Sequence, residues 1–510
     1  MALISATIFT LILLACILHL LLCKIKAKNL PPGPKGFPII GSIHLLKKLV
    51  HRDLQKLSQT YGPIMHMKLG FKSTIIISSP TIAKLFLKTH DPIFASRPIS
   101  HTSNQMSFNR KDIAFAQFGP YWHNMRKICS FQLLTSLKID SFSSIRRQEL
   151  GLLIDRLREA AKNHSIVDLN SQVSSLIAGV ICVMLFGKKF VDEEFMAAIH
   201  EVTFLAGALN LGDFIPFIAF LDLQGLGRRS KAISKAFDGF LNTIIEQHVE
   251  FKDQNNTKSG LFVDVMLDLM RSEKTKCQID RTSIKGVMFD LIVGGVDSTS
   301  TIINWALSEL IKHPQVMKKV QKELEEVVGL NRMVEESDLN QLKYLDMVIK
   351  ETFRMHPPIT LIPRKSTEDC NVNGYHIPKN THTLINAWAI GQDPSTWFQS
   401  HKFFPERFVD SQIDIKGKNF EMIPFGYGRR SCPGMQLAMT LVRLIVAQLV
   451  HCFDWKLPNG ALPSELDMTE EFGLTCPRAQ NLRLIPTFQL TSSISSKTKS
   501  SHREPKIKPF

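Results

Sequence analysis

One cysteine stands among glycines and arginines in the run Phe425-Gly-Tyr-Gly-Arg-Arg-Ser-Cys-Pro-Gly434. The apolar stretch from Met435 to Cys452 predicts a buried helix, and Pro433 suits its first position. Cys432 would then lie at a helix N-terminus, where the dipole, the free N–H groups and the two arginines favour a thiolate. A thiolate metal ligand and an incidental cysteine in a glycine-rich turn remain equally open on local chemistry alone. A phosphate loop is weaker, because no strand precedes the glycines and no Gly-Lys-Ser/Thr closes them.

Three further groups of residues have spacings that could do chemistry. Gly294-Gly-Val-Asp297-Ser298 puts two glycines and an acid inside a long apolar helix, which costs about 1 kcal/mol per glycine. A kink or flexible turn is the simpler interpretation. Glu351 and Arg354 are three residues apart and share a helix face, as an ordinary surface ion pair also would. Trp122 and Arg126 lie four apart, and a core tryptophan beside an exposed arginine is the ordinary alternative.

The run resembles the haem-binding signature F-x-x-G-x-R-x-C-x-G of cytochrome P450 enzymes at Phe425, Gly428, Arg430, Cys432 and Gly434. The resemblance implies haem b, held without covalent attachment, with Cys432 as the proximal iron ligand. It also implies that Phe425, Arg430 and Gly434 surround the ligand. No Cys-x-x-Cys-His occurs in the chain, which agrees with non-covalent haem.

The same resemblance assigns roles to the other groups. Trp122, Arg126, Arg364 and Arg430 would bind the haem propionates, and Glu351, Arg354 and Arg407 would form a buried structural triad. Asp297 and Ser298 would relay protons to bound dioxygen. The sequence departs from the family pattern here, because Ser298 replaces the usual threonine and lacks its rotamer-restricting methyl. We expect oxygen activation to survive, with looser coupling between reductant used and product made.

These parts imply a monooxygenase that hydroxylates a small lipophilic substrate with O₂. No Rossmann or flavin motif is present, so electrons would come from a separate NADPH-dependent cytochrome P450 reductase. Stretches such as "FASRP" (94–98) and "EEFGLTCPRA" (470–479) resemble plant microsomal members of the seventy-one clan. Other stretches resemble the seven-thirty-six A subfamily of that clan. That resemblance favours specialised metabolism, with a terpenoid such as a sesquiterpene first and a phenolic or biphenyl next. The pocket walls would be 103–118, 204–217, 294–298, 359–362 and 472–474.

Two other functions remain as alternatives. One is a haem-thiolate isomerase or dehydratase that needs neither O₂ nor reductase, and such members lack an acid–alcohol pair like Asp297 and Ser298. The other is a membrane carrier of haem or a lipophile, which has no reason to keep both the relay and the propionate clamp. The net charge of +16, from 62 Lys+Arg against 46 Asp+Glu, is not interleaved with aromatic residues, so we expect no nucleic-acid partner.

The elements that must position these residues are mainly helical with a minor β portion, in a P450-like fold. Residues 1–23 lack charged side chains and predict a transmembrane signal anchor, because 22 helical residues span about 33 Å. A basic, proline-rich linker follows (24–41), then the catalytic domain (42–490) and a disordered basic tail (491–510). Lysines after the anchor predict a single pass through the endoplasmic reticulum membrane, with the domain in the cytosol. We expect a hairpin at 64–69 and 73–78, a spine helix at 282–313, and further helices at 120–160, 165–187, 229–252, 315–328 and 340–355.

Overall fold

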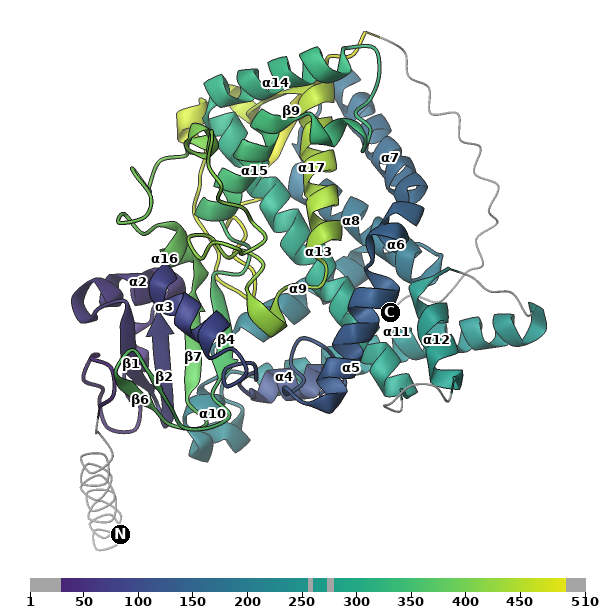
Figure 1. The fold of residues 1–510 in the computed structure, drawn as a ribbon. Helices are drawn as coiled ribbons and strands as arrows, with labels where there is room; N and C mark the ends of the chain where they lie inside the picture. Colours follow the sequence, from purple (N-terminus) through teal and green to yellow (C-terminus); the bar gives the residue numbers. More distant parts are fainter. Residues whose placement is uncertain (1–28, 256–259, 273–278, 492–510) are drawn as a thin grey trace, which may run out of the picture.

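A long central helix, α13 (Arg281–Lys312), organises the chain in this computed structural model, which describes residues 29–255, 260–272 and 279–491. The Asp280 side chain starts the helix by accepting a hydrogen bond from the Ser283 N–H, which satisfies an otherwise free donor. α13 is buried along most of its length and packs against α8, α9, α15 and α17. The predicted spine at 282–313 is therefore confirmed to within one residue, and it runs through the middle of the fold (Figure 1).

Most of the described chain is helical, which confirms the predicted class. The other helices are α2 (Val50–Tyr61), α3 (Pro80–Lys84), α4 (His101–Met106), α5 (Pro120–Ile128), α6 (Ser136–Ser141), α7 (Ser143–Lys162), α8 (Leu169–Phe186), α9 (Glu193–Gly207), α10 (Leu211–Phe214), α11 (Leu226–Asn255), α12 (Phe262–Arg271), α14 (Pro314–Val328), α15 (Lys343–Met355), α16 (Ala387–Gly391) and α17 (Met435–Cys452). α8 and α13 are apolar and long enough to span a bilayer by composition, but 72% of each candidate window is buried inside the fold.

The β portion consists of small sheets beside the helices (Figure 1). The largest has the strand order β1 (Ile64–Leu69), β2 (Lys72–Ile77), β7 (His382–Asn386), β4 (Leu361–Lys365). β1 and β2 form the predicted antiparallel hairpin, with Ile64 opposite Ile77, and β2 runs parallel to β7. A second sheet pairs β3 (Val167–Asp168), β9 (Arg483–Phe488) and β8 (Phe453–Lys456), and a third pairs β5 (Cys370–Val372) with β6 (Tyr375–Ile377).

Two sequence predictions differ from the structure in detail. The stretch 120–160 is not one helix: a π-helical turn, η3 (Cys129–Leu133), ends α5, and the Thr135 side chain then caps α6. α17 begins at Met435 rather than Pro433, because its first helical hydrogen bond runs from Ala438 N–H to Gly434 O at 2.9 Å. The predicted anchor (1–23), the start of the linker and nearly all of the basic tail lie outside the described residues.

Candidate functional site

Cys432 lies in a tight turn that leads into α17. The turn starts with the 3₁₀ helix η7 (Gly428–Arg430), and the Cys432 N–H donates to Phe425 O at 2.9 Å. Gly428 has φ +74°, and a Cβ there would approach Leu87 O to 2.7 Å, so only glycine fits. The carboxylate of Asp91 holds the turn by accepting from Arg429 N–H at 3.1 Å and from its guanidinium at 3.0 Å. The glycines of this run therefore serve the turn rather than a phosphate.

The protonation of Cys432 differs from the local expectation. Burial raises the pKa of its thiol, while the Gly434 N–H and the nearby Arg126 charge oppose that rise only in part. The helix terminus alone does not make Cys432 a thiolate. The expectation that every local group favours the thiolate is wrong, because burial favours the neutral thiol and outweighs the other groups. A bound metal cation deprotonates a coordinating thiol outright, which removes the conflict.

The burial pattern around Cys432 indicates an internal space beside it. The residue is surrounded deeply enough for burial to dominate its pKa, yet part of its surface stays accessible. The first turns of α17, from Met435 to Thr440, are likewise open, whereas Leu441 to Cys452 are almost entirely buried. On α13 the open positions Leu291, Gly294 and Ser298 recur at helical spacing within a buried helix. Because α13 packs against α17, these open surfaces come from neighbouring helices.

Arginines gather beside this space, and we call Arg97, Arg126, Arg364 and Arg430 the arginine cluster. Arg364 is 1% exposed, and among the described residues its Nε and Nη2 have no hydrogen-bond partner while its Nη1 donates to Pro363 O at 3.1 Å. Burial first, and then the charges of Arg97 and Arg430, hold its pKa well below the usual range. Burial also lowers the pKa of Arg97 to about 10 and that of Arg430 to about 9. The cluster has more buried positive charge than the protein itself neutralises.

Trp122 is placed against the cluster in a way that the sequence did not indicate. Its indole N–H donates to Ile113 O at 3.1 Å, and its ring lies 4.2 Å from the Arg430 guanidinium carbon. Arg126 Nη2 contacts only Ser431 Oγ, at 3.4 Å. The indole N–H is therefore already used by the backbone, and Trp122 supports Arg430 through its ring.

Two acids that sequence reasoning missed, the buried Asp112 and the partly exposed Asp290, hold the loop next to Trp122. Asp290 of α13 accepts from the N–H groups of Ile113 and Ala114 at 2.6 and 2.9 Å. Asp112 accepts from the N–H groups of Phe115 and Ala116. Burial raises the pKa of Asp290 to about 6, against the lowering effect of those N–H groups and of Arg430. No local signal marks Asp290, and Arg430 reaches it only through the tertiary fold, which brings the Cys432 turn against α13.

Asp297 and Ser298 do not contact each other in the described chain. Ser298 Oγ donates to Gly294 O at 2.6 Å, one turn back on α13. Asp297 is buried and accepts from Thr475 Oγ1, while its other oxygen lies 3.5 Å from Nδ1 of His200 on α9. The acid and the hydroxyl are adjacent in sequence but face different partners, since one residue along a helix turns the side chain by about 100°.

Glu351, Arg354 and Arg407 form one buried group. Arg354 donates twice to the Glu351 carboxylate, at 2.8 Å each, and Arg407 Nε donates to it at 2.9 Å. Arg354 Nη1 also donates to Gly391 O and Ser400 O. The group joins α15 to the segments that follow α16.

A second cluster with metal-binding residue types lies elsewhere. His51, Glu470 and Cys476 are buried with their ligand atoms within 4.8 Å of one another. Glu470 is already paired with Arg52 at 2.8 Å and His51 at 3.1 Å. Burial and the Glu470 charge raise the pKa of Cys476 well above its usual value. A protonated thiol beside a neutralised carboxylate is a poor metal site, and the pairing explains the cluster as a structural contact.

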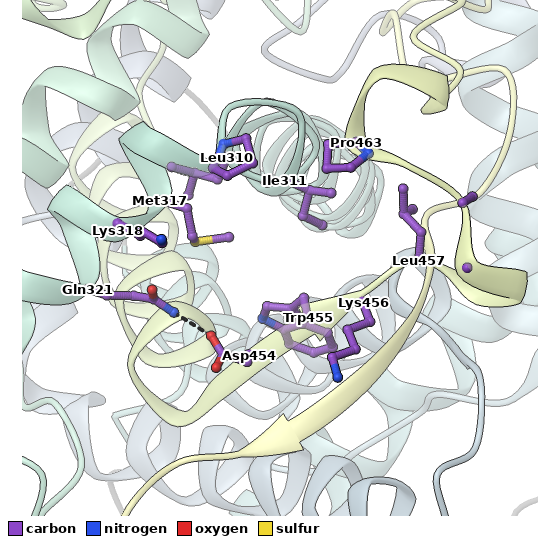
Figure 2. Close-up of a pocket in the computed structure, with 13 residues that line it drawn as sticks. Leu310, Ile311, Met317, Lys318, Gln321, Asp454, Trp455, Lys456, Leu457 and Pro463 are labelled. Atoms are coloured by element: carbon purple, nitrogen blue, oxygen red, sulfur yellow. Dashed lines mark hydrogen bonds between the residues drawn. The ribbon is translucent and has the colours of Figure 1, made fainter.

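A surface pocket of about 380 Å³ opens at the far end of α13 (Figure 2). Leu310, Met317, Trp455 and Leu457 line it, and Gln321 donates to Asp454 across its edge at 2.9 Å. Leu310 is 12 residues beyond Ser298, which corresponds to about 18 Å along a helix. This pocket is separate from the space beside Cys432.

Comparison with known proteins decides the family. The cytochrome P450 family model matches residues 31–482. The chain belongs to the cytochrome P450 family. Cytochrome P450 CYP736A12 of Panax ginseng is 47% identical over 91% of this chain and 94% of its own. A 3-beta-hydroxylase of Tanacetum parthenium is 39% identical over 90% of this chain and 93% of its own. The flavonoid 3'-monooxygenase of Petunia hybrida is 38% identical over 95% of this chain and 98% of its own. The predicted plant P450 resemblance is confirmed, and with it a haem enzyme whose iron has a cysteine thiolate ligand.

The residues beside Cys432 fit the haem of this cytochrome P450. Haem carries two propionate carboxylates, and Arg364 of the arginine cluster offers two buried guanidinium nitrogens without a partner among the described residues. An unsatisfied buried donor is costly, so the orphaned Nε and Nη2 of Arg364 indicate an anion that the protein does not itself supply. The fit depends on the donor chemistry of the cluster and on the open surface at Cys432 and α13.

Proposed function

We propose that this P450 hydroxylates a small lipophilic plant specialised metabolite with O₂ and reductase-supplied electrons, and that Cys432 is the iron ligand. The single observation that carries the proposal is the orphaned Arg364 within the arginine cluster, beside an internal space that Cys432, Gly294 and Ser298 border. A haem in that space would place its propionates among the arginines and its iron near Cys432.

Cys432 fits the ligand position better than Cys476 does. Cys432 has an accessible surface, a Gly434 N–H that favours the thiolate, and the positive Arg126 nearby. Cys476 is buried beside the Glu470 carboxylate, which opposes a second negative charge. Arg430 also connects the Cys432 turn to Ile113 and Ala116 by donating to their carbonyl oxygens. Arg430, two residues before the proposed ligand, thus fixes the Cys432 turn through backbone carbonyls, and the unpaired donors are those of Arg364.

The protein's own work is to bind, orient and manage protons, since haem when bound supplies the oxygen chemistry. Gly294 leaves the open stripe of α13 without a bulky side chain, whereas a Cβ on Gly295 would meet Ile181 Cδ1 of α8 at 2.6 Å. The Ser298 hydroxyl, which lies at this stripe, can donate into the space once it leaves Gly294 O. In this relay the Asp297 carboxylate, one residue away, would exchange a proton with that hydroxyl after side-chain rotation, because the two side chains have different partners in the structure. Asp297 and Ser298 act in this proposal as the acid–alcohol relay.

A surface for the NADPH-dependent reductase lies on the side of α17 where Cys432 sits. Ser136 of α6 donates to Gln436 of α17 at 2.9 Å, only four residues from Cys432. Leu137 is 84% exposed, and Phe131 is also exposed on the preceding turn. Lys127 stands exposed on α5. An apolar patch with basic neighbours suits a transient contact with an acidic protein partner.

Membrane attachment is proposed from the anchor sequence and from one apolar surface. Phe217 and Phe220, on the 3₁₀ helix η4 (Pro216–Leu221), are exposed, Phe220 by 82%. Phe71 at the β1–β2 turn donates its N–H to Phe214 O, and Gly70 donates to Ile40 O. The exposed apolar residues of η4 and of the chain near Ile40 thus gather around one hairpin, where residues 29–41 enter the fold (Figure 1). This supports a single-pass endoplasmic reticulum protein whose domain rests on the bilayer from the cytosolic side.

The substrate class follows from the chemistry of the proposed walls. Ile, Leu and Phe are concentrated in the wall segments 204–217, 359–362 and 472–474, so an apolar molecule suits these walls. Relatives named for flavonoid hydroxylation and for 3-beta-hydroxylation are almost equally distant, at 38% and 39% identity. The apolar walls therefore place a terpenoid such as a sesquiterpene before a phenolic or biphenyl.

The test is turnover by the full chain, co-expressed in microsomes with a plant NADPH-cytochrome P450 reductase. Sesquiterpenes, biphenyls and flavonoids are supplied in turn, and products are identified by mass spectrometry with ¹⁸O₂. We expect one labelled oxygen atom in the product, formed only with NADPH and reductase. Product formed without NADPH or O₂ would instead support the isomerase or dehydratase alternative, and tight binding without any product would support a carrier.

A further inference from the structure

The carboxylate of Asp297 is tied to two segments outside α13. Its Oδ2 accepts from the Thr475 hydroxyl, and its Oδ1 lies 3.5 Å from His200 Nδ1. The same two segments also meet each other, because Leu474 N–H donates to Thr203 O, and a Cβ on Gly207 would collide with the backbone of Gly473. α9, α13 and the 473–475 segment therefore join at Asp297.

Only one of these two partners can exchange protons with water. Thr475 is 6% exposed, and its hydroxyl does not titrate near neutral pH. The His200 side chain is 59% exposed, against 7% for Asp297. The hydrogen bond with Asp297 raises the pKa of His200 from its ordinary value of 6.5, although burial lowers it in part. The contact with Asp297 therefore favours the charged form of the His200 imidazole.

The other charged groups around His200 are occupied elsewhere. On its own helix, Glu201 forms a bidentate pair with Arg229 of α11, with both distances 2.7 Å. The Arg229 guanidinium also lies 4.9 Å from the Phe204 ring. α4 has no lysine, arginine or carboxylate in its sequence. Among the described residues, Asp297 is the one charged group that contacts the imidazole.

We propose that His200 is a positioning residue that connects Asp297 to solvent and resupplies it with protons during turnover. The proton on Nδ1 moves to Oδ1 of Asp297, which leaves a neutral imidazole and a neutral carboxylic acid. Water then replaces the proton at the exposed ring, and Asp297 passes its own proton inward through the relay. The inference rests on the proposed monooxygenase function, because only an oxygen-activating enzyme consumes protons at this site.

A purely structural role is the rival explanation, in which His200 only fastens α9 to α13. Glutamine separates the two, because its side chain can hydrogen-bond Asp297 but cannot carry a proton to it. His313→Gln is the matched control: His313 lies at the end of α13, its Nδ1 is 3.2 Å from Glu309 Oε2, and a hydrogen bond raises its pKa too. His313 is far from Asp297 along the helix.

The first experiment needs no turnover. Histidine-selective ¹³C labelling of the full haem-loaded chain gives a titration for each imidazole, and the resonance missing in His200→Gln identifies His200. We expect a pKa above 6.5 that falls in Asp297→Asn. A pKa at or below 6.5 that is indifferent to Asp297→Asn would show that the two groups do not interact and would overturn the proposal.

The second experiment uses reductase, substrate and NADPH. His200→Gln should lower product formed per NADPH by at least threefold, with more hydrogen peroxide and a larger solvent deuterium isotope effect, while His313→Gln matches the wild type. If His200→Gln forms as much product per NADPH as the wild type while His200→Ala forms less, His200 only fastens α9 to α13. That result would overturn the proposed proton supply. If the wild type consumes no NADPH with any substrate, the proposed function fails and this inference with it, whereas the histidine titration still reports the contact.

Discussion

Replacing Arg364 with leucine should have opposite effects on the empty and the haem-loaded protein. Without haem, Arg364 is a buried cation with two unpartnered nitrogens and like charges on Arg97 and Arg430. Removing it deletes an uncompensated charge, so the apoprotein should become no less stable, in contrast to the usual loss of about 1 kcal/mol or more for a core substitution. With haem, the same change removes a donor to a propionate.

The magnitude of the second effect follows from the hydrogen bonds at stake. A hydrogen bond to a charged group contributes about 1.5–3 kcal/mol net, which corresponds to a factor of about 10–140 in an equilibrium constant. Arg364 has its Nε and Nη2 free, so it can make at least one such bond. Haem retention in Arg364→Leu should therefore fall by about one to two powers of ten.

The assay is the rate of haem transfer to excess apomyoglobin, together with the thermal unfolding of haem-depleted protein. Arg147→Leu serves as the matched control, because Arg147 is 79% exposed and pairs with Glu335 at 3.1 Å on the surface. Haem transfer from the control should match the wild type. Unchanged transfer from Arg364→Leu, or an apoprotein strongly destabilised by the substitution, would refute the assignment of Arg364 to the haem carboxylates.

Three further substitutions test separate parts of the account. Arg354→Met leaves the buried Glu351 carboxylate with fewer partners, and breaking such a pair costs about 3–5 kcal/mol, so the yield of folded, haem-containing protein should fall severely. Ser298→Thr restores the methyl that restricts the side chain, and product formed per NADPH should rise; a fall would contradict the looser coupling expected of serine. Burial raises the pKa of Glu470, but hydrogen bonds from His51 and Arg52 outweigh it and lower the pKa to about 2. The ionised Glu470 carboxylate therefore contributes on the order of 3 kcal/mol to the free energy of unfolding. This contribution is present above pH 4.5 and is lost as pH falls toward 2. The gap in thermal midpoint between the wild type and Glu470→Gln should therefore narrow below pH 4.5, and a gap that is constant from pH 7 to 3.5 would contradict this.

Local patterns were sufficient for the elements that depend on near neighbours. The β1–β2 hairpin and α13 follow from alternation and apolar length, and both lie where the sequence predicts them. The glycine-rich turn also follows, since Gly428 has the left-handed conformation that such a residue permits. For the hairpin the determining contacts lie within the segment itself, whereas the Gly428 turn is also held by Asp91 and confined by Leu87 from a distant segment.

Contacts between distant segments could not be predicted from the sequence. Asp297 meets Thr475, 178 residues away, and His200 on another helix, and neither contact follows from the sequence around Asp297. Arg97 lies in the quoted "FASRP" stretch, but only the fold brings it beside Arg364. The net pKa of Cys432 likewise depends on how deeply the surrounding protein buries it, which the helix terminus does not reveal.

The most direct test of the central claim is the visible spectrum of reduced, CO-bound microsomes expressing the full chain, Cys432→Ala or Cys476→Ala. The account predicts a band near 450 nm in the wild type and in Cys476→Ala, and its loss in Cys432→Ala. A 450 nm band that survives in Cys432→Ala but vanishes in Cys476→Ala would contradict the assignment of the iron ligand, and with it the placement of the haem between α13 and α17.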